Sequence, residues 1–191
     1  MTRRTVYPIV GAVPEELGNM LRILRPAFLQ LRMKGASDED VVAAALSMRE
    51  SIRRSGAGTR LVMNDRPDIA VRCGVSVVHV GDEDMPPSQV RRRYPDLAVG
   101  WSAHTLDDIE RANSFDLIYV AFGPVFPSAT KVTGRAPVLA LVPEALRLSR
   151  HPLVFIGGIA PDNIEQLPFR HDTQAAVIGA LQDFMEQYRH D

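Results

Sequence analysis

Two aspartates, Asp65 and Asp84, stand 19 residues apart, and each comes at the end of a short apolar run. Carboxylates that meet at one edge of a sheet repel each other, share a proton or hold a divalent cation. The chain has a single cysteine, Cys73, so a thiolate cluster is excluded. Oxygen ligands favour Mg²⁺, which also binds phosphates. The structural alternative is that Asp65 caps a helix and Asp84 lies in a turn.

The lysines are the second chemical signal. Of the 22 basic residues, 20 are arginines, and only Lys34 and Lys131 are lysines. Lysine carries a compact, mobile charge that suits a phosphate, whereas arginine offers a planar fork. Both lysines follow apolar runs, as the two aspartates do. Two ammonium groups beside two carboxylates predict a site for a pyrophosphate.

The run 28–34 alternates polar and apolar residues, which predicts Gln30, Arg32 and Lys34 on one side of a strand. Polar side chains inside a barrel need partners, so this side is either a salt-bridge layer or, as we favour, a ligand site. His79 and His104 lie near strand ends and are expected to form hydrogen bonds or position a ligand rather than bind a metal. Either could serve as a general base.

Eight apolar runs of strand length alternate with helical stretches. The runs are 5–11, 28–34, 60–65, 76–81, 98–104, 117–123, 152–158 and 175–181. Helix starts are indicated at Ser37–Asp40, Thr105–Asp108, Pro143 and Pro161, and the stretches 66–74 and 85–94 read as short helices.

Eight such units predict a (β/α)8 TIM barrel formed by one domain, 1–191, and close to the smallest size of that fold. A doubly wound sheet is the alternative, but its glycine-rich turn after the first strand is missing. In a barrel the active site lies where the strands end. There, Gly157-Gly158 and Ile178-Gly179 indicate a phosphate site built from backbone N–H groups.

Composition narrows the class of protein. The chain is 46% hydrophobic and 24% charged, with a net charge of −1, which predicts a folded protein that binds neither nucleic acid nor a membrane surface. Its N-terminus reads as a strand rather than a signal peptide, and no run is long enough to span a membrane. We expect a cytoplasmic protein, and a homo-oligomer is compatible with the sequence.

Several stretches together resemble the thiamine phosphate synthase family and its thiazole tautomerase-like relatives. They are QLRMK (30–34), VMNDRPDIA (62–70), VHVGDED (78–84), GWSAHT (100–105), FGPVFPSATK (122–131), IGGIAPDNI (156–164) and AAVIGAL (175–181). The resemblance implies condensation of a hydroxymethylpyrimidine diphosphate with a thiazole phosphate, through a pyrimidine-methyl cation, to give thiamine phosphate and pyrophosphate.

The resemblance also implies residue roles. Asp65 and Asp84 would hold Mg²⁺, while Arg32, Lys34, Asn64 and Lys131 would bind the departing pyrophosphate. Gln30 and Ser102 would bind the pyrimidine diphosphate, and His79 would line its site. Ser128 and Thr130 would contact the thiazole phosphate, whose phosphate group Gly158, Ile178 and Gly179 would bind through backbone amides. Lys34, Lys131 and Ser102 are the expected catalytic groups.

Three positions depart from the family pattern. Ser128 replaces a usual threonine, Gly179 a common serine, and Leu139 a glycine found in many relatives. Leu139 and Gly179 leave open a non-catalytic barrel that binds a thiamine precursor or phosphate. A thiazole tautomerase on the same scaffold, with a histidine such as His104 as base, is the other alternative. The presence of both aspartates together with both lysines favours the synthase.

Overall fold

Eight parallel strands close into one barrel in sequence order in the computed structural model, which describes residues 4–127 and 136–189. The strands are β1 Val6–Val10, β2 Phe28–Leu31, β3 Arg60–Asn64, β4 Val77–Val80, β5 Ala98–Ala103, β6 Tyr119–Phe122, β7 Leu153–Ile156 and β8 Gln174–Val177. The first seven strands lie within their predicted runs, and β8 begins one residue early. The predicted (β/α)8 fold is confirmed.

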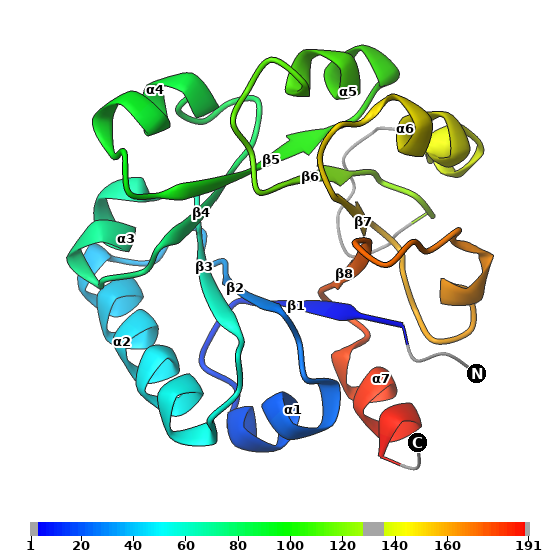
Figure 1. The fold of residues 1–191 in the computed structure, drawn as a ribbon. Coiled ribbons are helices and arrows are strands. Elements are labelled where there is room, and N and C mark those ends of the chain that lie inside the picture. Colours follow the sequence, from blue (N-terminus) through cyan, green and yellow to red (C-terminus); the bar gives the residue numbers. More distant parts are fainter. Residues whose placement is uncertain (1–3, 128–135, 190–191) are drawn as a thin grey trace.

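Helices surround the barrel (Figure 1). They are α1 Leu17–Leu24, α2 Asp38–Ser55, α3 Pro67–Arg72, α4 Pro87–Arg93, α5 Leu106–Ala112, α6 Val142–Leu148 and α7 Leu181–Tyr188, with 3-10 helices η1 Leu139–Leu141 and η2 Ile164–Gln166. The helix expected from Pro161 is only the single turn η2. Pro168 explains this difference, because the residue before a proline is driven to an extended conformation, and Leu167 has ψ 132°.

Two predicted helix starts carry the expected caps. The Ser37 hydroxyl accepts a hydrogen bond from the backbone N–H of Asp40, and Gly56 closes α2 in the left-handed conformation with φ 66°. At α5, Thr105 and Asp108 exchange side-chain and backbone hydrogen bonds in a complete capping box. These caps fix where α2 and α5 begin, and so fix the lengths of the loops that follow β2 and β5.

Buried side chains form two separate clusters. The larger cluster joins strand residues to helix residues and includes Trp101. The smaller contains only strand residues and therefore lies inside the barrel: Tyr7, Ile9, Phe28, Val62, Val77, Tyr119, Ala121, Val154 and Ala176. Gly100 makes room for this filling, since a Cβ there would lie 2.2 Å from Cζ of Tyr119.

The strand β2 ends earlier than its apolar run. It stops at Leu31, so Arg32 and Lys34 belong to the following loop, and the alternation rule does not place them on the side of Gln30. The backbone N–H of Arg32 still donates to the carbonyl of Val10, at 2.8 Å, and so holds this loop against the end of β1.

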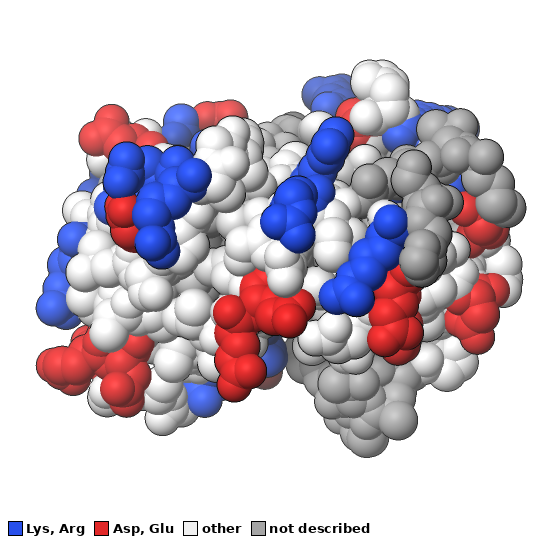
Figure 2. Space-filling model, turned by 90° about the horizontal axis from the view of Figure 1, so that it is seen from below, with Lys and Arg blue, Asp and Glu red and all other residues white. Residues whose placement is uncertain are grey.

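The surface agrees with the near-neutral charge. Acidic and basic residues are interspersed over the face shown in Figure 2, rather than gathered into one basic field. Within residues 4–127 and 136–189, no helix has the length and apolar character needed to cross a membrane.

Candidate active site

The two aspartates come together beyond the ends of β3 and β4. Asp65 has φ 60°, a left-handed conformation, and its N–H donates to the carbonyl of His79 at 2.8 Å. An Asp84 carboxylate oxygen accepts from the N–H of Gly81 at 2.7 Å. Burial raises the pKa of Asp84, and the neighbouring Asp65 carboxyl raises it further through a hydrogen bond and its charge. The structure therefore brings the predicted pair close enough for Asp65 to hinder the ionisation of Asp84.

The helix-cap alternative for Asp65 is wrong, because α3 begins after Arg66 and has no side-chain cap. The turn expected for Asp84 does exist, since its carboxylate binds the N–H of Gly81. That turn holds Asp84 in place facing Asp65, so the turn and the pair are parts of one arrangement.

Lys34 is the cation beside this pair. Its Nζ lies 3.4 Å from a carboxylate oxygen of Asp65, and its charge acts to lower the pKa of Asp84. The Lys34 side chain is 60% exposed, so the ammonium group stays accessible to a ligand. Lys34, Asn64 and Asp65 also line a cavity of about 230 Å³ with Leu31, Met33, Gly35, Ala36, Val41, Met63 and Arg66.

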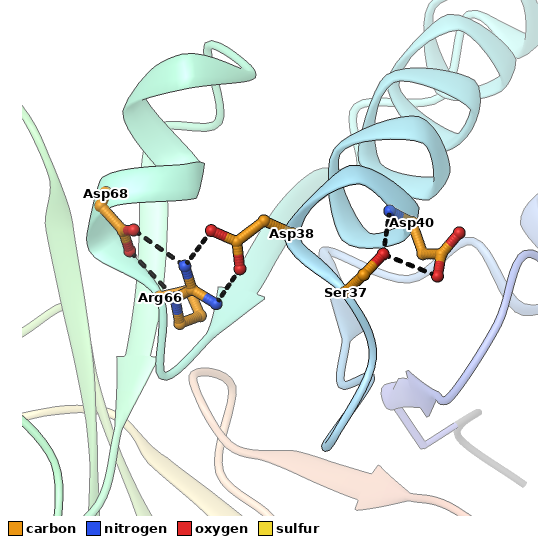
Figure 3. A network of polar contacts seen from close by, with 5 residues as sticks. All are labelled: Ser37, Asp38, Asp40, Arg66 and Asp68. Carbon is orange, nitrogen blue, oxygen red and sulfur yellow. Dashed lines mark hydrogen bonds and ion pairs between the residues drawn. The ribbon is translucent and has the colours of Figure 1, made fainter.

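Arg66 ties the loop after β3 to the first residue of α2, and the sequence did not single it out (Figure 3). Its guanidinium binds both carboxylate oxygens of Asp38 at 2.8 and 3.0 Å, and those of Asp68 at 2.9 and 3.1 Å. These bonds raise the pKa of Arg66 and lower those of both aspartates. Because Asp38 opens α2 and Arg66 follows Asp65, the clamp fixes the loop after β3 against the start of α2.

Polar side chains also cross the barrel interior. Gln30 Nε2 donates to the Tyr7 hydroxyl at 2.9 Å, and the Tyr7 and Tyr119 hydroxyls are 2.9 Å apart. His79 Nδ1 lies 3.1 Å from the Tyr119 hydroxyl, and His79 Nε2 lies 2.9 Å from Oγ of Ser102. The structure thus joins three predicted site residues through two tyrosines that the sequence did not identify. Gly100 was the available signal, because a glycine within a strand marks a close approach.

His104 follows β5. Its Nδ1 lies 2.6 Å from the carbonyl of Gly123, which fixes Nδ1 as the donor and leaves Nε2 unprotonated in the neutral ring. The backbone N–H of His104 donates to the Asp108 carboxylate at 2.9 Å. These bonds hold the imidazole at the mouth of the barrel, as its place at the end of a strand predicts.

Glycines shape the loop after β7. Gly157 and Gly158 have φ values of 99° and 66°, which L side chains rarely adopt. A Cβ on Gly158 would lie 2.3 Å from the carbonyl oxygen of Pro127. After the neighbouring strand β8, Ile178 is 41% exposed and Gly179 is also exposed. The backbone predicted to bind phosphate therefore follows two adjacent strands, β7 and β8.

Comparison with known proteins decides the family. A family model described as thiamine monophosphate synthase matches residues 7–181. The chain belongs to the thiamine monophosphate synthase family. It is 37% identical over 158 residues to a thiamine-phosphate synthase of Albidiferax ferrireducens, covering 80% of this chain and 70% of that one. It is 34% identical over 155 residues to a thiamine-phosphate synthase of Synechococcus, covering 80% of this chain but 43% of that one.

The fold comparison agrees with the family. A solved structure described as thiamine phosphate pyrophosphorylase from Pyrococcus furiosus superposes with a TM-score of 0.79 at 25% identity, covering 97% of this chain and 94% of that one. The thiamine monophosphate synthase family is thus supported by sequence and by architecture.

Some predicted residues of this family member lie outside the described structure, namely Ser128, Thr130 and Lys131. Leu139, one of the three departures from the family pattern, begins η1 and packs partly buried against the outer core. Arg32 is half-buried at the end of β2, next to the loop that carries Lys34. The described residues thus contribute the carboxylate pair, Lys34, the hydrogen-bonded side chains inside the barrel and the glycines after β7.

Proposed function

We propose that this protein joins 4-amino-5-hydroxymethyl-2-methylpyrimidine diphosphate to thiazole phosphate, giving thiamine phosphate and pyrophosphate. The observation that carries this proposal is the meeting of Asp65, Asp84 and Lys34 beyond adjacent strands of a barrel in this family. In such a cluster the lysine can bind anionic groups of the substrate, and the carboxylates can bind a cation. Both substrates are small charged molecules. We propose that the reaction takes place in the cytoplasm.

The carboxylate pair fits Mg²⁺. Burial and the charge of Asp65 both penalise ionisation of Asp84, and a divalent cation would relieve that repulsion. No cluster of three or more acidic, histidine or cysteine ligands occurs among the described residues. Two carboxylates suit Mg²⁺, which usually completes its coordination with water and substrate phosphates. When bound, Mg²⁺ would neutralise negative charge on the diphosphate.

The chain's own residues carry the rest of the proposed reaction. The bond between the hydroxymethyl carbon and the diphosphate oxygen breaks, and its electron pair leaves with pyrophosphate. Lys34, Arg32, Asn64 and Lys131 would stabilise that departing charge, which is the main requirement of an ionisation. The resulting pyrimidine-methyl cation is stabilised by its ring amino group. The thiazole nitrogen supplies the electron pair for the new carbon–nitrogen bond, so no general base is needed.

The proposed reaction requires that the pyrimidine and thiazole substrates be held next to each other. Gln30 and Ser102 would hold the pyrimidine diphosphate, with His79 lining that site. Backbone N–H groups of Gly158, Ile178 and Gly179 would hold the thiazole phosphate, to which Ser128 and Thr130 would add hydroxyl contacts. Fixing the thiazole nitrogen in line with the cation favours capture over hydrolysis.

One assay tests the proposal. The protein is incubated with both substrates and Mg²⁺, and thiamine phosphate and pyrophosphate are measured. Equal release of both products supports a synthase. Binding of the thiazole phosphate without any product would support a non-catalytic barrel. Isomerisation of a thiazole carboxylate tautomer alone, abolished in His104→Ala, would support the tautomerase, because His104 Nε2 is the available base.

A further inference from the structure

A row of five hydrogen-bonded side chains runs through the barrel beneath the carboxylate pair. In order it consists of Gln30, Tyr7, Tyr119, His79 and Ser102, from β2, β1, β6, β4 and β5, and we call it the interior row. Four of its members are buried, since Gln30 is 2% exposed, Tyr7 and Tyr119 are each 1% exposed, and His79 is 8% exposed, whereas Ser102 is half-buried. Its two ends are the side chains expected to hold the pyrimidine diphosphate. We propose that Tyr7 and Tyr119 are positioning residues that set which atoms of Gln30 and Ser102 donate and which accept toward that substrate.

The direction of each hydrogen bond follows from the one before it. Gln30 Nε2 only donates, so the Tyr7 oxygen accepts, and the Tyr7 proton goes to its other partner, the Tyr119 oxygen. The Tyr119 proton is then directed at Nδ1 of His79, which accepts it. A histidine that accepts at Nδ1 is neutral and carries its proton on Nε2. That proton is donated to Oγ of Ser102.

Packing holds the middle of the row in this arrangement. The rings of His79 and Tyr119 are nearly parallel, at 10° with centroids 5.7 Å apart. Gly100 is paired with both His79 and Tyr119 in the sheet, and it leaves room for the Tyr119 ring, which a side chain there would overlap. Burial raises the pKa of both Tyr7 and Tyr119, so both keep their protons at neutral pH and can donate them.

The two ends of the row consequently present opposite chemistry. Ser102 Oγ already accepts from His79, so its own proton is free to be donated to a ligand. Gln30 has turned its amide nitrogen to Tyr7, which leaves its amide oxygen as an acceptor. One donor and one acceptor match a heteroaromatic ring that carries a ring nitrogen and an exocyclic amino group. If every hydrogen bond of the row ran the other way, Gln30 would donate and Ser102 would accept, which matches a ring with an oxo group and a protonated ring nitrogen. By setting the direction, the tyrosines would select aminopyrimidines over oxopyrimidines.

This inference rests on the proposed function, and substitutions that keep both rings test it kinetically. In Tyr119→Phe we expect KM for the pyrimidine diphosphate to rise about 10-fold, since a buried bonding partner is lost, with a smaller rise in Tyr7→Phe. KM for the thiazole phosphate should stay unchanged, and discrimination against the oxo analogue of the pyrimidine should fall. Tyr94→Phe, which removes a hydroxyl outside the row, is the control and should behave as wild type. Equal changes in both KM values, or none in Tyr119→Phe, would overturn the proposal.

A second measurement needs no substrate or activity. The ring nitrogens of His79 are observed by ¹⁵N NMR in the free protein and assigned by their loss in His79→Gln. We expect a neutral ring with its proton on Nε2 in the wild type, and a mixture of tautomers in Tyr119→Phe, whose cooperative thermal unfolding checks that the variant is folded. A proton on Nδ1 in the wild type would overturn the proposal. An inactive protein with the expected tautomer would instead refute the proposed function and leave the interior row supported.

Discussion

Lys34 Nζ lies 3.4 Å from a carboxylate oxygen of Asp65, although the two residues come from loops after different strands. This contact places a mobile cation at the edge of a carboxylate pair whose second member, Asp84, resists ionisation. An isolated surface ion pair would contribute little to stability. The contact matters for chemistry, because the Lys34 side chain is 60% exposed and its ammonium group can leave the carboxylate and bind a phosphate.

Replacing Lys34 should therefore reduce turnover far more than stability. We expect kcat in Lys34→Ala to fall on the order of 100-fold, as when one group that stabilises developing charge is removed. Lys34→Arg should recover only part of the activity, because its planar fork differs in geometry. Steady-state kinetics and thermal unfolding measure the two effects. Arg150→Ala, an exposed cation removed elsewhere, is the control, and equal losses in both variants would contradict the assignment.

The clamp made by Arg66 predicts a pH-dependent contribution to stability. Arg66 lowers the pKa of Asp38 and Asp68 in the folded protein. Such carboxylates contribute stability above their unfolded pKa of about 3.9, and that stability is lost as pH falls through the lower folded pKa. Arg66→Gln should thus unfold a few degrees below wild type near neutral pH, and this gap should close in strong acid. Thermal unfolding at several pH values measures the gap.

The matched control for that experiment is Arg92→Gln, which removes an exposed arginine from the last turn of α4. Its unfolding temperature should follow the wild type at every pH. A gap between Arg66→Gln and wild type that stays constant down to strong acid would show that the two aspartates do not carry the effect.

The loop after β7 predicts a sharp dependence on glycine. In Gly158→Ala the new Cβ meets the carbonyl of Pro127 at 2.3 Å, and φ 66° disfavours any side chain. We expect a loss of about 1 to 3 kcal/mol in the free energy of unfolding and a higher KM for the thiazole phosphate. Gly58→Ala is the control, since that position has open space and an ordinary φ. Chemical denaturation measures the free energy of unfolding, and steady-state kinetics measures KM. Equal values for Gly158→Ala and Gly58→Ala would refute this role of Gly158.

Substituting Gly100 tests the interior packing without removing any hydrogen-bonding group. In Gly100→Ala the methyl group would overlap the ring of Tyr119, so the ring must shift. We expect weaker pyrimidine binding with little change in thiazole binding, because only the interior row is disturbed. The control is Gly18→Ala on α1, where a Cβ meets nothing within 4 Å. Calorimetric titration with each substrate separates the two effects, and unaltered pyrimidine affinity would count against the role of Tyr119.

The sequence predicts the barrel well because buried parallel strands are continuous apolar runs. It predicts where strands and helices end less well. Arg32 and Lys34 continue the alternation of β2 beyond Leu31, although the strand has ended. The helix expected after Pro161 shrinks to η2, because Pro168 stops it after one turn.

The candidate site divides in the same way. Asp65, Asp84 and Lys34 are recognisable because their charges stand out at the ends of apolar runs. Tyr7 and Tyr119 are not, since an aromatic residue inside an apolar run looks like ordinary core, and only pairing across the closed barrel brings the two hydroxyls to 2.9 Å. Arg66 is equally hidden, because its partner Asp38 lies 28 residues away and meets it only when the loop after β3 packs against the start of α2.

In the proposed reaction, the carboxylate pair supports release of pyrophosphate. The most direct measurement is the rate of thiamine phosphate formation as Mg²⁺ is titrated, for wild type, Asp65→Asn, Asp84→Asn and the control Glu83→Gln, which removes a charge from the same loop. We expect Mg²⁺-dependent product from wild type and Glu83→Gln, and a loss on the order of 100-fold in both aspartate variants. Product formed at equal rates by all four proteins, or formed without Mg²⁺, would contradict this role of the pair.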